Sequence, residues 1–289
     1  MFRKYGLIGI LLILFVELNF VLKIEPFASW YFPIIWLGYI LILDAVIYKM
    51  KNQSLITNHL KTFLTLFLIS AIFWWIFELV NFRLQNWDYG SKSFSSLASL
   101  FKATLSFSTV LPAFVETVEL LQTFHLFSHE KLKKSHNISK HLLHSMVSLG
   151  IIFLLLVILL PKYTFPLVWV AFYFILDPIN YLHRQPSIIQ HIKDRKLAIP
   201  INLFLAGIIL GFFWEFWNYY AIVKWYYNIH FLGFMKVFEM PILGYLGYGP
   251  FAFELYAMYY YVKSLHIGQK VKYLLKEDSN FNEFSFSKS

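Results

Sequence analysis

The sequence predicts an all-α, polytopic membrane protein, and three observations lead to this prediction. Hydrophobic residues make up 58% of the 289 residues and charged residues only 14%, against roughly 25% charged in a soluble domain. Apolar runs long enough to cross a bilayer as helices recur along the whole chain. There are no cysteines, which excludes disulfides, thiolate metal sites and cysteine nucleophiles.

The apolar runs predict about eight transmembrane helices. The first run follows basic residues, as in a signal peptide, but no small-residue cleavage site comes after it, so we expect an uncleaved span. Prolines and glycines in the runs are compatible with helices, because neighbouring helices can satisfy the freed backbone groups. The expected spans are residues 6–22, 31–48, 62–82, 103–127, 142–160, 165–182, 199–222 and 242–262.

The basic residues predict the orientation of the chain. Lysine and arginine number 18 in the termini and connecting segments on one side, and 7 in those on the other. The positive-inside rule therefore places both termini in the cytoplasm. We expect a multi-pass protein of the cytoplasmic or inner membrane of the cell. The last residues, 277–289, have no helical period and are predicted to be a disordered tail.

The two halves of the chain match each other in four places, in the same order, at offsets of 133 to 138 residues. An even number of helices in each half keeps both halves in the same orientation, so we predict two parallel four-helix repeats. The first repeat is expected at residues 1–130 and the second at 142–276, with a cytoplasmic linker at 131–141. The matched motifs are Phe32-Pro33 with Trp36 and Asp44, Ser54, Glu78 with Asn81, Trp87 and Tyr89, and Pro112 with Glu116 in the first half, and Phe165-Pro166 with Trp169 and Asp177, Ser187, Glu215 with Asn218, Trp225 and Tyr227, and Pro250 with Glu254 in the second.

Eight acidic residues fall within the expected spans, and six of them are related in pairs by the repeat. Ionisable groups inside a membrane are rare and usually face a bundle interior, so each is a functional candidate. Asp44 and Asp177 lie near helix ends. The simpler interpretation is that each pairs with a nearby cation or backbone donor and so fixes the helix end. The other four pair members are glutamates, expected in the middle or outer half of the bilayer, where they can converge.

These glutamates and two neighbouring asparagines form the expected catalytic site. A carboxyl buried without a cationic partner is expected to stay protonated, and it can then donate a proton. An asparagine three residues after a glutamate shares its helix face and can orient it. The alternative is structural, since Glu–Asn hydrogen bonds hold helices together in lipid. The candidates are Glu78, Asn81, Glu116, Glu215, Asn218 and Glu254.

Aromatic residues, 21% of the chain, are the candidates for substrate binding. An aromatic lining suits a flat conjugated or polyprenyl ligand, and electron-rich ring faces stabilise a carbocation. For any single ring, ordinary packing is the alternative. Glu239 joins this group because it lies two residues before Pro241, an arrangement that the matched stretch of the first half lacks. The substrate-binding candidates are Trp74, Trp87, Trp214, Trp217, Trp225, Tyr227 and Glu239.

Several classes of function are disfavoured. Five of the ten histidines cluster around the linker, and no H-E-x-x-H arrangement lies beside the buried acids, so no metal site is expected, although His230 could join the site. No nucleotide-binding or G-x-S-x-G pattern occurs, and we expect no cofactor. The net charge of +9 is explained by membrane orientation rather than nucleic-acid binding.

The order of these motifs resembles a known family. A Glu-x-x-Asn motif, a Trp-x-Tyr loop and a Pro followed by Glu are similar to the small integral-membrane lycopene cyclase domain, of the heterodimeric or tandem type. The resemblance implies an isomerase of carotenoid biosynthesis that cyclises the ends of a linear carotene by acid catalysis, without a redox cofactor. That family has two adjacent acids after its proline and three helices per repeat, where this chain has one acid and four helices.

Three hypotheses follow. The first is an acid-catalysed enzyme that cyclises or otherwise modifies a carotenoid or isoprenoid lipid, in which Glu215 or Glu254 donates the proton. The second is a transporter or lipid-binding scaffold with its site between the two repeats. The third is a structural membrane protein whose acids only join helices. The expected partner is a membrane lipid or isoprenoid ligand, not nucleic acid, and a homo-oligomer stays open.

Overall fold

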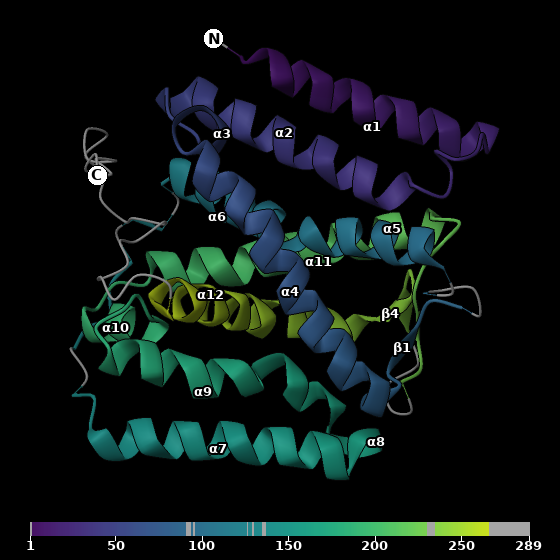
Figure 1. Ribbon diagram of the computed structural model, residues 1–289. Coiled ribbons are helices and arrows are strands. Elements are labelled where there is room, and N and C mark those ends of the chain that lie inside the picture. The colour runs from purple at the N-terminus through teal and green to yellow at the C-terminus, as the bar shows by residue number, and fades with distance from the viewer. Residues whose placement is uncertain are drawn as a thin grey trace. The chain divides into compact units, whose positions relative to one another are not determined.

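The computed structural model is mainly helical (Figure 1). Within the described residues, seven helices are long and apolar enough to cross a membrane, as expected of an all-α polytopic membrane protein. The predicted tail, residues 277–289, and His230 lie outside the described part. That part consists of residues 2–90, 94, 96–125, 127–128, 130–134, 137–229 and 235–265.

The chain divides into two compact units. Unit 1 comprises Met1–Thr123 and Ile209–Tyr245, and unit 2 comprises Phe124–Ile208 and Leu246–Ser289. The first boundary lies close to the end of the predicted first repeat. The segment from Ile209 to Tyr245, which the repeat assigns to the second half, groups with unit 1.

Unit 1 begins with two long helices that lie side by side (Figure 1). Their close approach depends on two glycines, because a Cβ added to Gly9 would come within 2.7 Å of the Gly38 carbonyl oxygen. Small residues of this kind are how helices approach each other in lipid. The helices of the first segment are α1 (Lys4–Leu22), α2 (Tyr31–Lys51), α3 (Leu55–Asn58), α4 (Leu60–Leu84), α5 (Leu97–Ser108) and α6 (Val110–Thr123).

The expected span 103–127 is built from two helices, α5 and α6, with a break at Thr109. Ser70 on α4 compensates for the break. Its hydroxyl donates to the Phe107 carbonyl at 2.6 Å and accepts from the Leu111 N–H at 2.9 Å. A side chain on a neighbouring helix thus binds two backbone groups at the break, as expected for helices that are interrupted inside a membrane.

Short strands, which the sequence did not predict, close the loops of unit 1. They form two antiparallel pairs, β1 with β2 and β3 with β4. Each strand has two residues, so no alternating pattern exists from which to predict it. The strands are β1 (Trp87–Asp88), β2 (Tyr226–Tyr227), β3 (Lys236–Val237) and β4 (Met240–Pro241).

In unit 2, α9 packs against both α7 and α12. Gly150 on α7 approaches the backbone of α9, where an added Cβ would lie 2.8 Å from the Ala171 carbonyl oxygen. Helix α11 begins in unit 2 and ends in unit 1. The remaining elements are α7 (Lys140–Leu159), α8 (Pro161–Thr164), η1 (Phe165–Leu167), α9 (Val168–Leu182), α10 (Ile188–Lys193), α11 (Ala198–Tyr220), η2 (Ile242–Gly247) and α12 (Tyr248–Leu265).

The eighth expected span, 242–262, differs from the prediction. It forms the 3₁₀ helix η2 and then α12, which is not among the seven apolar helices. Its tyrosines and Glu254 lower its mean hydropathy. Most of α12 is buried on all sides, and a helix buried among protein helices does not need the hydropathy of one that faces lipid.

Asp44 and Asp177 bind backbone donors near helix ends, which agrees with the simpler of the two interpretations given above. In unit 1, Asp44 accepts the N–H of Ile56 at 2.9 Å. In unit 2, Asp177 accepts the N–H groups of Ile188 and Ile189 at 2.7 and 3.0 Å. In both cases an aspartate near the end of one long helix binds the free N–H groups of the short helix that follows.

Candidate functional site

The site is positioned by a loop that Asn81 holds in place. Helix α4 ends at Leu84, and Gln85 turns the chain with a left-handed φ of 52°. The Asn81 side chain then binds the returning chain at three points. Its Oδ1 accepts from the N–H groups of Asn86 and Trp87 at 3.0 and 3.3 Å, and its Nδ2 donates to the Trp87 carbonyl at 2.8 Å. These three bonds hold Trp87 close to the end of α4.

Asn218 makes the same arrangement after α11. Its Oδ1 accepts the N–H of Trp225 at 2.9 Å, and its Nδ2 donates to the Trp225 carbonyl at 2.9 Å. The two asparagines therefore bind the loops, whereas the sequence suggested that they orient the glutamates. Asn81 also interacts directly with the Glu78 side chain through a hydrogen bond, as the sequence predicted.

The two loops pair with each other. Trp87 stands opposite Tyr227 and Asp88 opposite Tyr226 in the antiparallel β1–β2 pair. The N–H of Asn228 also donates to the Asn86 carbonyl at 2.8 Å. All of these residues belong to unit 1. The pairing brings together the Trp-x-Tyr motifs of both halves of the sequence.

Glu78 receives three hydrogen bonds on one oxygen. Its Oε1 accepts from Tyr89 Oη at 2.6 Å, from Trp87 Nε1 at 3.0 Å and from Trp74 Nε1 at 3.1 Å. Two of these donors come from the loop and one from the preceding turn of α4. None of the three uses Oε2.

Tyr89 stays a hydrogen-bond donor over a wide pH range. Burial raises the pKa of its phenol well above the usual value, and the charge and hydrogen bond of Glu78 raise it further. A phenol that keeps its proton can donate to a carboxylate, which can only accept. Tyr89 is therefore available as a donor to Glu78 near neutral pH.

Glu215 has the equivalent position near the end of α11. It is fully buried, and its Oε1 accepts a hydrogen bond of 2.7 Å from Tyr227 Oη. Tyr245 lies close enough to interact with it electrostatically. Glu78 and Glu215 lie six and five residues before the ends of their helices, so each is about 8–9 Å inside its helix end.

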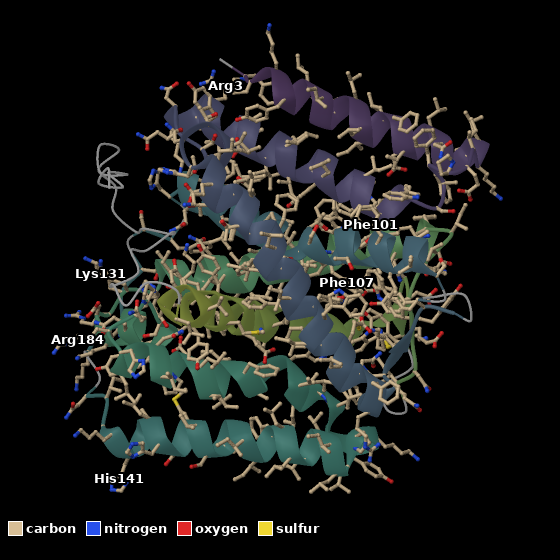
Figure 2. All side chains as sticks on the ribbon, in the orientation of Figure 1. Arg3, Phe101, Phe107, Lys131, His141 and Arg184 are labelled. Atoms are coloured by element: carbon tan, nitrogen blue, oxygen red, sulfur yellow. The ribbon has the colours of Figure 1, made fainter. Side chains whose placement is uncertain are left out.

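Aromatic rings surround Glu78. The rings of Trp74 and Phe107 lie 5.9 Å apart, and those of Tyr89 and Phe94 lie 5.4 Å apart. Trp75 packs edge-on against Phe107 at 5.2 Å. Phe107 is labelled in Figure 2, where the surrounding side chains are densely packed. This set places aromatic rings around Glu78, and their role in binding a substrate stays a prediction.

The tryptophans near Glu215 pack within the protein. Trp214 and Trp217 are each only 5% exposed, and both contact the ring of Trp36 on α2, at 5.6 and 4.8 Å. Trp225 packs edge-on against Phe32 at 5.3 Å. Their observed contacts are therefore with other rings, and their predicted role in substrate binding stays a prediction.

The structure places the other predicted site residues elsewhere. Glu116 interacts with Asp44 and Lys51 of α2 rather than with Glu78. Glu254 lies in unit 2, where its Oε1 accepts the N–H of Phe172 at 2.8 Å.

Glu239 lies in unit 1 and forms a salt bridge of 2.9 Å with Lys224. This ion pair gives Glu239 a structural role in the loop between α11 and η2, in addition to any contact with a ligand.

Sequence reasoning did not single out Tyr89, Phe107 or Tyr245 as site residues. A signal existed for Tyr89, since it is the counterpart of Tyr227 in the repeated Trp-x-Tyr motif. No pattern in the sequence pointed to Phe107, because its position depends on the break between α5 and α6. Among the described residues, no group of three histidine or acidic side chains could hold a metal ion.

No protein-family model, curated protein or solved structure matches this chain.

Proposed function

We propose that this chain is an integral-membrane enzyme in which Glu78 and Glu215 act as an acid–base pair on an isoprenoid lipid. The observation that carries this proposal is the β1–β2 pair, in which Trp87 stands opposite Tyr227. Each of these residues donates a hydrogen bond to the glutamate of its own half of the sequence. Two carboxyls with different surroundings can divide the acid and base roles between them.

The proposed reaction is an isomerisation. Glu215 in its acid form donates a proton to a terminal C=C bond of the substrate, which leaves a carbocation on the adjacent carbon. A second C=C bond of the same molecule attacks this cation and closes a ring. Glu78 then removes a proton from a neighbouring carbon and restores a C=C bond. One proton is gained and one lost, so the reaction requires no oxidant, reductant or cofactor.

The different surroundings of the two carboxyls support these roles. Glu215 is fully buried, and an ionised carboxylate is costly in such surroundings, so Glu215 is assigned as the proton donor. Glu78 is held by three donors, which stabilise the charge of a carboxylate, so it is assigned as the base. The rings of Trp74, Tyr89 and Phe107 can stabilise the carbocation.

We further propose that the chain consists of two parallel four-helix repeats, with both termini in the cytoplasm and its spans in the cytoplasmic or inner membrane. Three local arrangements that recur at repeat-related positions support the duplication. Asp44 and Asp177 bind the N–H groups of a following short helix. Ser54 and Ser187 each accept a hydrogen bond from the backbone three residues on, at the start of that helix. Asn81 and Asn218 each bind a loop.

The function is tested in a bacterial host that accumulates a linear carotene. Expression of the wild-type chain is expected to yield cyclised carotene in the pigment extract, and Glu78→Gln or Glu215→Gln is expected to lower this yield at least about 100-fold, in the range typical for loss of a general acid or base. Glu17→Gln is the matched control, because Glu17 also lies in a helix and accepts a tyrosine hydrogen bond, from Tyr31 Oη at 3.0 Å. Equal cyclised product from wild type and both variants would refute the assignment.

A transporter is the second candidate function. It is favoured by the fully buried Glu116, which interacts with Asp44. A proton-coupled carrier needs buried carboxyls of this kind. Carotene or isoprenoid flux into proteoliposomes that depends on a pH gradient, without any conversion of the lipid, would support this candidate over the enzyme.

A further inference from the structure

A second group of charged side chains lies in unit 1, between α2 and α6, which pack against each other. Asp44 on α2 and Glu116 on α6 are both fully buried, with no exposed surface. Lys51 on α2 forms an ion pair with Glu119 on α6. This group contains three carboxyls and one ammonium, so it holds an excess of buried negative charge if all of them are ionised.

The two fully buried acids differ in their partners. Asp44 accepts hydrogen bonds from the Ile56 N–H, at 2.9 Å, and from the Tyr5 hydroxyl. Glu116 has no such donors. With all carboxyls ionised, neither of its oxygens has a hydrogen-bond partner within the described residues. A buried carboxylate in this situation would bear the full cost of desolvation.

The missing partner of Glu116 is the other carboxyl. The Glu116 and Asp44 side chains lie within hydrogen-bonding range of each other. An ionised carboxylate can only accept hydrogen bonds, whereas a protonated one can also donate. The contact between them therefore becomes a hydrogen bond only when one of the two acids carries a proton. Because Asp44 already has two donors to stabilise its charge, Glu116 is the acid that carries it.

Other ionisable groups near the pair do not replace this proton. On α2, Lys51 acts on Glu116 electrostatically, but its ion pair is with Glu119. Tyr39, also on α2, directs its hydroxyl to Thr117 at 2.9 Å. Tyr5 of α1 contacts Asp44 and not Glu116. Among the described residues of α4 and α5, which also pack on α6, no ionisable group acts on Glu116.

We propose that Glu116 and Asp44 form a buried one-proton binding site, in which Glu116 donates a hydrogen bond to the Asp44 carboxylate and joins α6 to α2. The ligand is a proton, and the site is distinct from the Glu78–Glu215 site because it uses different helices and different side chains. Loss of the proton leaves two like charges buried side by side, which loosens the contact between α2 and α6. The proposal does not depend on the enzyme reaction.

Infrared difference spectroscopy of the purified full chain tests the proposal. A protonated carboxylic acid and a carboxylate absorb at different frequencies, so wild type minus Glu116→Gln is expected to show the loss of one carboxylic-acid band near neutral pH. Glu17→Gln is the control for removal of an acid from a span. A spectrum in which Glu116→Gln removes a carboxylate band, and no carboxylic-acid band, would overturn the proposal.

Two further measurements use variants chosen to fold. Glu116→Gln keeps a hydrogen-bond donor for Asp44, so it mimics the protonated state. The unfolding temperature of wild type is expected to fall as the pH rises and the site loses its proton, whereas that of Glu116→Gln should not fall for this reason. Asp44→Asn removes the like charge, so the Glu116 carboxylic-acid band should disappear at a pH at least about one unit lower, a tenfold difference in proton concentration. An Asp44→Asn protein that folds and titrates like wild type would also overturn the proposal.

Discussion

Trp87 and Tyr227 stand opposite each other in a two-residue antiparallel ladder, and each donates a hydrogen bond to the glutamate of the helix that precedes it, Glu78 or Glu215. The ladder thus links two carboxyls that are 137 positions apart in the sequence. An asparagine side chain binds each of the two loops. The candidate site therefore depends on the loops as much as on the helices.

The loop held by Asn81 should be sensitive to loss of that side chain. Asn81→Ala removes three hydrogen bonds and leaves buried backbone groups of Asn86 and Trp87 without partners. The expected loss of stability is about 2–4 kcal/mol, since each buried group left unpaired costs about 1–3 kcal/mol. Thermal unfolding in detergent measures it. Asn58→Ala, which removes a single bond on an exposed helix end, should cost about 1 kcal/mol, and equal losses in the two variants would contradict the account.

Tyr89 should make the stability of the fold fall at high pH. Burial and Glu78 raise the pKa of Tyr89, so the folded state holds this proton at a pH where the unfolded chain has released it. Its contribution is complete below the usual tyrosine pKa of about 10 and is lost as pH rises above that value. Tyr89→Phe is expected to flatten the pH dependence of the unfolding temperature above about pH 10. The exposed Tyr163, changed to Phe, is the control. Identical pH profiles for wild type and Tyr89→Phe would count against the burial of this phenol.

The Lys224–Glu239 ion pair should be measurable in a double-mutant cycle. We expect a coupling free energy of about 1 kcal/mol from the stabilities of Lys224→Met, Glu239→Gln and the double variant, because the pair is only partly exposed. Both single variants should retain cyclase product in the carotene-producing host if Glu239 is structural. Loss of product in Glu239→Gln alone, with no coupling to Lys224, would instead make Glu239 a ligand-binding residue.

The sequence predicts the helices well because length and apolarity are sufficient to identify a span. The expected spans 31–48 and 62–82 lie within α2 and α4. The expected span 242–262 overlaps α12 (Tyr248–Leu265), whose tyrosines and Glu254 are tolerated because neighbouring protein surrounds most of the helix. Burial against protein helices is a tertiary property, and no local pattern reports it.

The candidate site was predicted only in part. Glu78 and Glu215 were identified because an acid within an apolar run is conspicuous. Their partners were not all predictable, since Asn81 can bind either a carboxyl on its own helix face or the loop that returns after the helix. In the structure Asn81 does both, since it binds the loop and also interacts with Glu78. Glu116 was expected to converge with Glu78 from its depth alone, but depth does not say which face of α6 it occupies, and that face meets Asp44.

The most direct test of the central claim is deuterium incorporation by the purified protein in heavy water with a linear carotene as substrate. If Glu215 donates a solvent-exchangeable proton to a terminal C=C bond, mass spectrometry of the product should show one deuterium for each ring formed, and Glu215→Gln should form no ring. Cyclised product without deuterium, or full activity of Glu215→Gln, would contradict the assignment of Glu215 as the acid.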